Sequence, residues 1–182
     1  MKNILLIYKT KTGFTEKYST WIAEETNCKM ISFAKIPTLN LNNYDIIIYG
    51  AGLHAGRING LNKFRKKIVN LIDKKVIVFA TGGTPYNEEI VNKIFEENFT
   101  KKEQENIRFF YFQSGVNYEK MGLFDKIIMK IYSKILQIKN KKTEVEEGTS
   151  KAIATSYDHS SKEYINPMIN YLKSLTSGGK IS

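Results

Sequence analysis

Residues 4–15 read Ile4-Leu5-Leu6-Ile7-Tyr8-Lys9-Thr10-Lys11-Thr12-Gly13-Phe14-Thr15. The apolar run at the start is too short for a buried helix and rich in branched side chains, which is typical of a central parallel strand. A hydroxyl-rich turn follows, and the spacing of apolar residues in 15–26 predicts a helix. Hydroxyl groups and free backbone N–H groups then meet at the positive end of a helix dipole. We therefore predict a phosphate site between the first strand and the first helix.

The turn matches a known motif. Position by position it fills the pattern Thr/Ser-x-Thr-Gly-x-Thr, and after an N-terminal strand this resembles the FMN-phosphate loop of flavodoxins. The resemblance implies FMN as the cofactor. A simpler interpretation is a plain turn at Thr12-Gly13 with Thr15 as an N-cap, but the place of the motif in a strand–turn–helix unit favours phosphate. The loop residues expected to bind the cofactor are Thr10, Lys11, Thr12, Gly13, Phe14 and Thr15.

Length and composition indicate one ordinary globular domain. The chain has 182 residues, of which 42% are hydrophobic and 25% are charged. The single cysteine, Cys28, excludes a disulfide framework and a thiolate cluster for metal, so we expect a reducing cytoplasm and no metal site. The start of the chain does not read as a signal peptide, and no apolar run reaches membrane-spanning length. We expect a soluble or peripheral protein.

The net charge of +10 comes mainly from lysines. A solvated lysine surface is one interpretation. The other is attraction to an anionic membrane surface or an acidic protein, because summed surface charge steers association. Nucleic acid is not expected as a partner, since no recognisable binding module accompanies the charge.

Strand-like runs alternate with helical periods along the whole chain. Further strands are predicted at 28–33, 45–49, 75–80 and 107–112, helices at 61–72, 88–99 and 160–175, a polar connection at 36–43 and a frayed tail at 176–182. This alternation predicts an α/β three-layer sandwich with a five-stranded parallel sheet, in the flavodoxin-like order 2-1-3-4-5, as a single domain over 1–182. The turns after strands one, three and four should share one rim and form one site.

Small residues in two of these turns would let the backbone approach a flat ligand closely. In a flavodoxin-like site they hold the isoalloxazine ring, and Tyr86 is the candidate for stacking on it. Placed beside the ring, His54 could donate a hydrogen bond or carry a proton, and Arg57 could pair with a substrate carboxylate; the plainer alternative is that Arg57 only caps a helix or lies in solvent. The cofactor-binding residues expected here are Ala51, Gly52, Leu53, His54, Thr81, Gly82, Gly83 and Tyr86, with His54 and Arg57 as catalytic candidates.

Other nucleotide-binding classes fit less well. Residues 50–56 resemble a dinucleotide fingerprint, but they have one residue too many before the third glycine and follow the third strand instead of the first. A receiver domain would need acidic residues after the first strand, where Lys9-Thr10 stands, and an Asp ending the third, where Tyr49-Gly50 stands. No Walker lysine motif is present.

An insertion at about 113–149 follows the fifth strand. Its centre, 122–138, has helical period with a wide apolar stripe and lysines on the other side. It is either a core helix on the sheet or an interfacial helix that contacts a membrane.

The segments 49–56 and 112–126 resemble the flavodoxin-type, quinone-dependent protoporphyrinogen dehydrogenases. The resemblance implies oxidation of protoporphyrinogen IX, electron delivery to a membrane quinone and peripheral attachment to the cytoplasmic face of a membrane. One departure is His54, where those enzymes tend to carry Arg. The alternative is a non-enzymatic flavodoxin-type electron carrier that docks a redox partner, although such carriers are usually strongly acidic.

Overall fold

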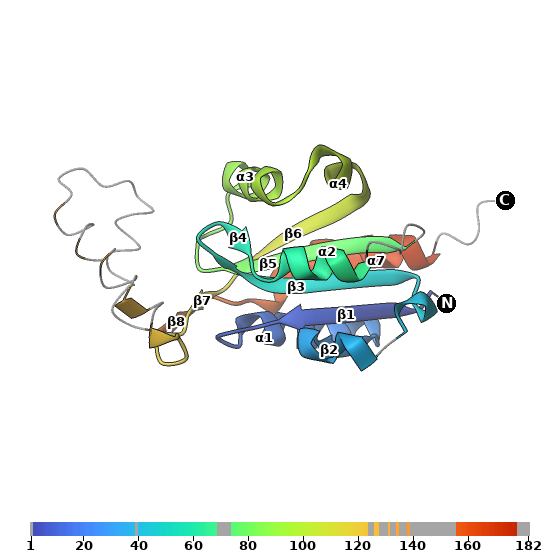
Figure 1. Cartoon of the computed structure of the whole chain (residues 1–182), viewed down its shortest axis with the longest axis horizontal. Helices are drawn as coiled ribbons and strands as arrows, with labels where there is room; N and C mark the ends of the chain where they lie inside the picture. The colour runs from blue at the N-terminus through green and yellow to red at the C-terminus, as the bar shows by residue number, and fades with distance from the viewer. Residues whose placement is uncertain are drawn as a thin grey trace.

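A parallel β-sheet forms the centre of the protein (Figure 1). The computed structural model describes residues 2–38, 40–68, 74–123, 126, 127, 131, 134, 138 and 156–177. The main strands lie side by side, each pair parallel, in the order β2 (Lys29–Ser32), β1 (Ile4–Lys9), β3 (Ile46–His54), β5 (Lys75–Gly82) and β6 (Ile107–Gln113). The predicted flavodoxin-like order 2-1-3-4-5 is confirmed, and the topological switch falls between β1 and β3.

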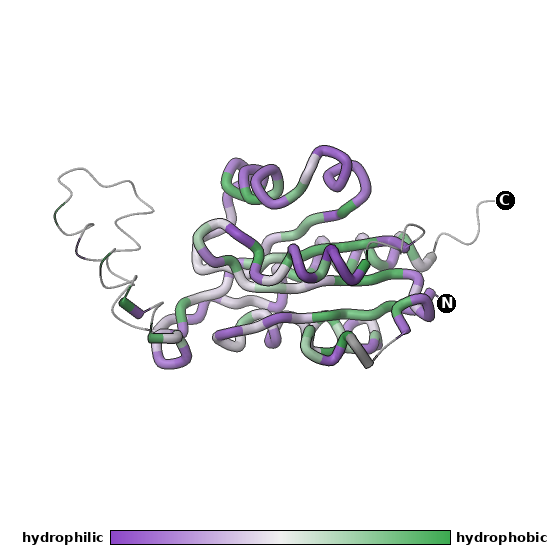
Figure 2. The backbone as a smooth tube through the Cα atoms, viewed as in Figure 1, coloured by the Kyte–Doolittle hydropathy of each residue, from purple (hydrophilic) through white to green (hydrophobic). Residues whose placement is uncertain are grey.

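Helices cover both faces of the sheet, as a three-layer sandwich requires. They are α1 (Phe14–Thr26), η1 (Phe33–Thr38), α2 (Leu61–Ile68), α3 (Glu88–Asn98) and α7 (Asn166–Ser177). Successive strand side chains point to opposite faces, so Ile47 belongs to the core shared with α2 and α3, and Ile48 to the core shared with α1 and α7. Figure 2 shows the hydrophobic residues concentrated along the strands.

The third strand is longer than the sequence predicted. Residues 50–54, expected in a loop, continue β3 to His54, and the chain turns back at once into β4 (Arg57–Ile58). The reversal takes two residues, Ala55 and Gly56, both with positive φ (47° and 75°). A two-residue turn of this kind matches the twist of the strands that it joins. A hairpin therefore replaces the expected loop at the rim of the sheet.

Three helical segments also differ from the prediction. The connection 36–43 carries η1 and η2 (Leu41–Asn43), and Ile36 and Leu41 are buried in the core. An unpredicted helix, α4 (Lys101–Asn106), begins with a capping box between Thr100 and Glu103. The closing helix divides into η3 (Lys162–Ile165) and α7. The predicted helix 61–72 is confirmed as far as Ile68, and its remainder, 69–73, lies outside the described residues.

The two ends of the insertion meet in a second small sheet. β7 (Gly115–Val116) pairs antiparallel with β8 (Tyr157–Asp158), beyond the carboxyl end of β6 (Figure 1). Most of the predicted helix 122–138 lies outside the described residues. Of the helices that the structure describes, none combines the length and apolar composition needed to cross a membrane.

Candidate functional site

A cavity of about 520 Å³ opens at the carboxyl ends of β1, β3 and β5. This is the place where ligands bind in open α/β sheets. Segments from four parts of the chain form its wall: the turn after β1, the β3–β4 hairpin, the end of β5 and the stretch after β6. The lining residues are Lys11, Thr12, Phe14, Thr15, Gly52, Leu53, His54, Ala55, Asn59, Thr81, Gly82, Gly83, Ser114, Gly115, Val116, Asn117 and Met121.

The turn after β1 exposes the N-terminus of α1 to this cavity. Thr10 Oγ1 accepts a hydrogen bond from the backbone N–H of Gly13 at 2.9 Å, which closes the turn. Gly13 occupies the N-cap position with φ 98°, and no side chain caps the helix. The first N–H groups of a helix have no intrahelical acceptor, so the amides of Phe14, Thr15 and Glu16 are available to a bound anion. This arrangement agrees with the predicted phosphate loop.

The Thr15 hydroxyl was predicted to bind phosphate, but in the structure it bonds to another side chain. The Thr15 side chain is 2% exposed, and Thr15 Oγ1 lies 2.9 Å from Thr81 Oγ1 at the end of β5. The bond lies beneath Gly52, where an added Cβ would stand 3.7 and 3.8 Å from the two hydroxyl oxygens. The hydroxyls of Thr15 and Thr81 therefore form the floor of the cavity, and the amide of Thr15 remains the candidate for binding phosphate.

The end of β5 presents backbone to the cavity because side chains have no room there. A Cβ on Gly82 would approach the Tyr111 hydroxyl oxygen to 2.8 Å, and one on Gly83 would approach that of Tyr157 equally closely. The Tyr111 hydroxyl donates to Thr84 O at 2.6 Å, and burial raises the pKa of Tyr111, so it stays protonated at neutral pH. The peptide groups of Gly82 and Gly83 are thereby held at the rim.

The hairpin that carries Leu53 and His54 is fixed by one buried side chain, Asn98 of α3. Asn98 Nδ2 donates to Gly56 O at 2.7 Å and to Ile94 O at 2.8 Å. Its Oδ1 accepts from the Ile58 N–H at 2.9 Å. The turn of the hairpin is thus anchored to α3.

Five lining residues that follow β6 were not predicted from the sequence: Ser114, Gly115, Val116, Asn117 and Met121. The Ser114 N–H donates to Gly82 O at 2.7 Å, which extends the β5–β6 pairing. Asn117 Nδ2 donates to Thr12 O at 3.4 Å, so this segment lies on the phosphate loop. The predicted insertion begins at 113, and its first residues are part of the site.

Three predicted residues are placed differently by the structure. Tyr86 is 63% exposed and does not line the cavity, so the structure does not bring it to the predicted stacking position. Arg57 lies on the outer side of the hairpin and donates to Glu97 O in the last turn of α3. A cation at this end of a helix interacts favourably with the helix dipole. The side chain of Ala51 is buried in the α2–α3 core, so only its backbone belongs to the rim.

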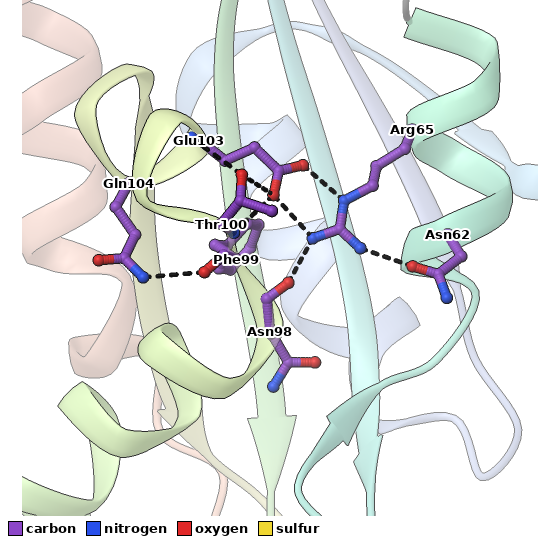
Figure 3. Close-up of polar contacts among 7 residues, drawn as sticks. All are labelled: Asn62, Arg65, Asn98, Phe99, Thr100, Glu103 and Gln104. Atoms are coloured by element: carbon purple, nitrogen blue, oxygen red, sulfur yellow. Dashed lines mark hydrogen bonds and ion pairs between the residues drawn. The ribbon is translucent and has the colours of Figure 1, made fainter.

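A second hollow, of about 850 Å³, lies on that outer side of the hairpin, between α2 and the end of α3. One of its lining residues, Arg65, is engaged in the fold (Figure 3). Its guanidinium donates to Glu103 Oε1 (2.5 Å) and Oε2 (3.0 Å), to Asn62 Oδ1 (2.5 Å) and to Asn98 O. Arg57 and Arg65 thus join elements of the fold, and the smaller cavity at the strand ends is the better candidate site.

Comparisons with known proteins identify a family and one curated relative. A family model described as a flavodoxin domain matches residues 5–146. An uncharacterised protein of Methanocaldococcus jannaschii is 29% identical over 103 residues, which are 56% of this chain and 68% of that protein.

Solved structures of flavoproteins are similar at greater distance. A Lactobacillus acidophilus flavoprotein in complex with FMN is 16% identical, with a TM-score of 0.45 over 61% of this chain and 91% of that one. A WrbA-like flavodoxin of Agrobacterium tumefaciens is 13% identical, with a TM-score of 0.47 over 85% and 96% of the two chains.

Proposed function

This chain belongs to the flavodoxin-domain family, and from that premise we propose that it binds FMN in the cavity at the ends of β1, β3 and β5 and acts as a redox protein. One observation carries the proposal. An uncapped helix N-terminus and three stretches of exposed backbone converge on one pocket. A pocket of about 520 Å³ lies within the range of roughly 300–1,000 Å³ that is usual for cofactors.

The residues present fit the two ends of the cofactor. The amides at the start of α1 suit a dianionic phosphate, because they combine unpaired donors with the positive end of the helix dipole. The other end suits a flat ring with polar edges, since Gly52, Gly82 and Gly83 offer peptide groups without side chains. Leu53 and Met121 add apolar surface to the same wall.

When bound, FMN supplies the capacity to accept and release electrons. The protein supplies orientation. The backbone of the hairpin and of residues 81–83 would hold the ring edge, and His54 at the cavity wall would be placed to donate a hydrogen bond to it.

Our finer proposal is that the protein oxidises protoporphyrinogen IX or a related reduced compound and passes the electrons and protons to a quinone. The similarity of segments 49–56 and 112–126 to the flavodoxin-type protoporphyrinogen dehydrogenases supports it. The site also favours it in one respect, because the second of these segments contributes Ser114, Gly115, Val116, Asn117 and Met121 to the cavity wall.

Contact with a membrane is part of this proposal. Leu123, Ile127 and Ile131 are helical, are spaced four residues apart and expose 81%, 55% and 55% of their surface. Side chains at this spacing share one face of a helix. Lys126 and Lys134 lie nearby in the sequence, which suits an interface with anionic lipid.

The alternative is an electron carrier that docks a redox protein. The net charge of +10 favours an acidic partner, since opposite charges steer association. This alternative needs the same cofactor and differs only in the electron donor and acceptor.

Reconstitution followed by anaerobic assay tests these proposals in order. The purified protein should quench the fluorescence of added FMN at one equivalent, then oxidise protoporphyrinogen IX with a menaquinone analogue as acceptor. Protein that takes up no FMN would overturn the cofactor assignment. Protein that binds FMN but neither oxidises protoporphyrinogen IX nor reduces the menaquinone analogue would overturn the proposed enzyme activity. The electron carrier would then be the remaining proposal.

Flotation with vesicles that contain anionic lipid tests the membrane contact. The intact chain should float with the vesicles, and the double variant Ile127→Asp/Ile131→Asp should remain at the bottom. Equal flotation of the two would remove this part of the proposal.

A further inference from the structure

A turn formed by residues 117–121 lies directly on the phosphate loop. Asn117 holds it from both sides, because its Nδ2 donates to Thr12 O at 3.4 Å and its Oδ1 accepts from the Lys120 N–H at 3.1 Å. The Tyr118 N–H donates to Ser156 Oγ at 2.9 Å, which ties the turn to the strand returning through β8. These bonds set the position of the Lys120 backbone relative to the loop.

The Lys120 ammonium reaches the N-terminus of α1. Its Nζ stands 3.8 Å from the point that a Cβ on Gly13 would occupy. Among the described residues, no carboxylate forms an ion pair with it, and its side chain is exposed. Neighbouring lysines are engaged otherwise: Lys17 pairs with Asp158 at 2.7 Å, and Lys126 donates to Glu119 O at 3.3 Å.

This arrangement is unfavourable in the absence of an anion. A positive charge beside a helix N-terminus opposes the dipole, which favours negative charge there. The acidic residue of the first turn, Glu16, directs its carboxylate to the Tyr8 hydroxyl of β1, from which it accepts a hydrogen bond at 2.7 Å. The Lys120 ammonium and the uncapped amides thus lie at the same helix N-terminus, and a dianion bound there would stabilise both.

We propose that Lys120 binds the phosphate group of the cofactor and makes the site select phosphorylated flavin over riboflavin. The inference rests on the proposed binding of FMN. Lys120 and the backbone amides of the loop would both contribute to the selectivity for phosphorylated flavin. A charge-assisted hydrogen bond is about twice as strong as a neutral one, so the share should be measurable.

Titration of the flavin-free chain of 182 residues with FMN and with riboflavin, followed by flavin fluorescence, tests the proposal. Lys120→Gln should weaken FMN binding by about tenfold and change riboflavin binding by less than about twofold. Lys120→Arg should keep most of the FMN affinity. Lys102→Gln, in exposed α4, is the matched control and should change neither. The difference between wild type and Lys120→Gln should shrink at high salt, since exposed charges are screened.

Thermal unfolding gives a second readout. Without flavin, Lys120→Gln should melt no lower than the wild type, because it removes an unfavourable charge, yet FMN should raise its Tm by less. Equal weakening of FMN and riboflavin, or an unchanged ratio of their affinities, would overturn the role of Lys120 and leave FMN binding intact. A wild-type chain that binds neither flavin would overturn the proposed function and this inference together.

Discussion

Thr15 Oγ1 and Thr81 Oγ1 form a buried hydrogen bond 2.9 Å long between residues that are 66 positions apart in the chain. One belongs to the first turn of α1 and the other to the end of β5. The bond crosses beneath Gly52 of β3, the strand between them. It therefore fixes the distance between the two loops that we assign to the phosphate and to the ring of the cofactor.

Replacing Thr81 by valine should destabilise the protein by about 1–3 kcal/mol, because the Thr15 hydroxyl is left buried without a partner. The double variant Thr15→Val/Thr81→Val should lose less than the sum of the single variants, since it removes both polar groups. Urea unfolding measures the three free energies. Thr20→Val, on the exposed side of α1, should stay within about 0.5 kcal/mol of the wild type. Strictly additive losses would show that the two hydroxyls are not coupled.

Asn98→Ala should loosen the β3–β4 hairpin. The substitution removes bonds to Gly56 O and Ile94 O and leaves the buried Ile58 N–H unpaired, so we expect a loss of about 2–4 kcal/mol. Flavin binding should weaken as well, because Leu53 and His54 lose their anchored position. Asn92→Ala, at an exposed position of the same helix, is the control and should change neither property. Chemical denaturation measures the stability of the two variants, and flavin titration measures their affinity.

Much of the fold could be predicted because local composition specifies it. Runs such as Ile46 to Ile48 are rich in branched apolar residues, and their alternation with helical periods predicts a parallel sheet, whose strand order follows from the flavodoxin-like pattern that fits the spacing. The hairpin could not be predicted in this way. Residues 50–54 include two glycines and one alanine, which read as a turn, and the positive φ of Ala55 leaves no mark in the sequence. The helix α4 did carry a signal, because Thr100 and Glu103 have the spacing of a capping box.

The site was predictable where it depends on strand ends and less so where it depends on pairing between distant segments. The turns after β1 and β5 follow from the topology, since carboxyl ends of parallel strands share one edge. Asn117 and Lys120 reach the phosphate loop only because β7 pairs with β8, and neither strand is long enough to stand out in the sequence. Arg57 was expected to face the ligand, yet the hairpin directs it to the end of α3.

The Arg65–Glu103 pair should make stability depend on pH. Burial acts to raise the pKa of Glu103, but hydrogen bonds from Arg65 and Thr100 outweigh it and lower the pKa in the folded state. A lowered pKa adds stability above the unfolded value of about 4.3, and this stability is lost as the pH falls through the folded value. Glu103→Gln should therefore cost about 1–2 kcal/mol at pH 7 and much less near pH 3. Urea unfolding at the two pH values checks this.

The matched control for that comparison is Glu105→Gln in the same helix, an exposed carboxylate. Its effect should be small at both pH values. A cost for Glu103→Gln that stays constant between pH 7 and pH 3 would show that the ion pair does not stabilise the fold.

Gly13→Ala should impair the cofactor site more than the fold. Gly13 has φ 98°, a conformation that costs a residue with a Cβ about 1–2 kcal/mol. The strain can relax if the turn rearranges, which would move the N–H groups of Phe14 and Thr15 away from the phosphate position. We therefore expect a fall in FMN affinity of tenfold or more, with a loss of stability of no more than about 2 kcal/mol. If Gly13→Ala binds FMN as tightly as the wild type, the amides of this turn do not hold the phosphate.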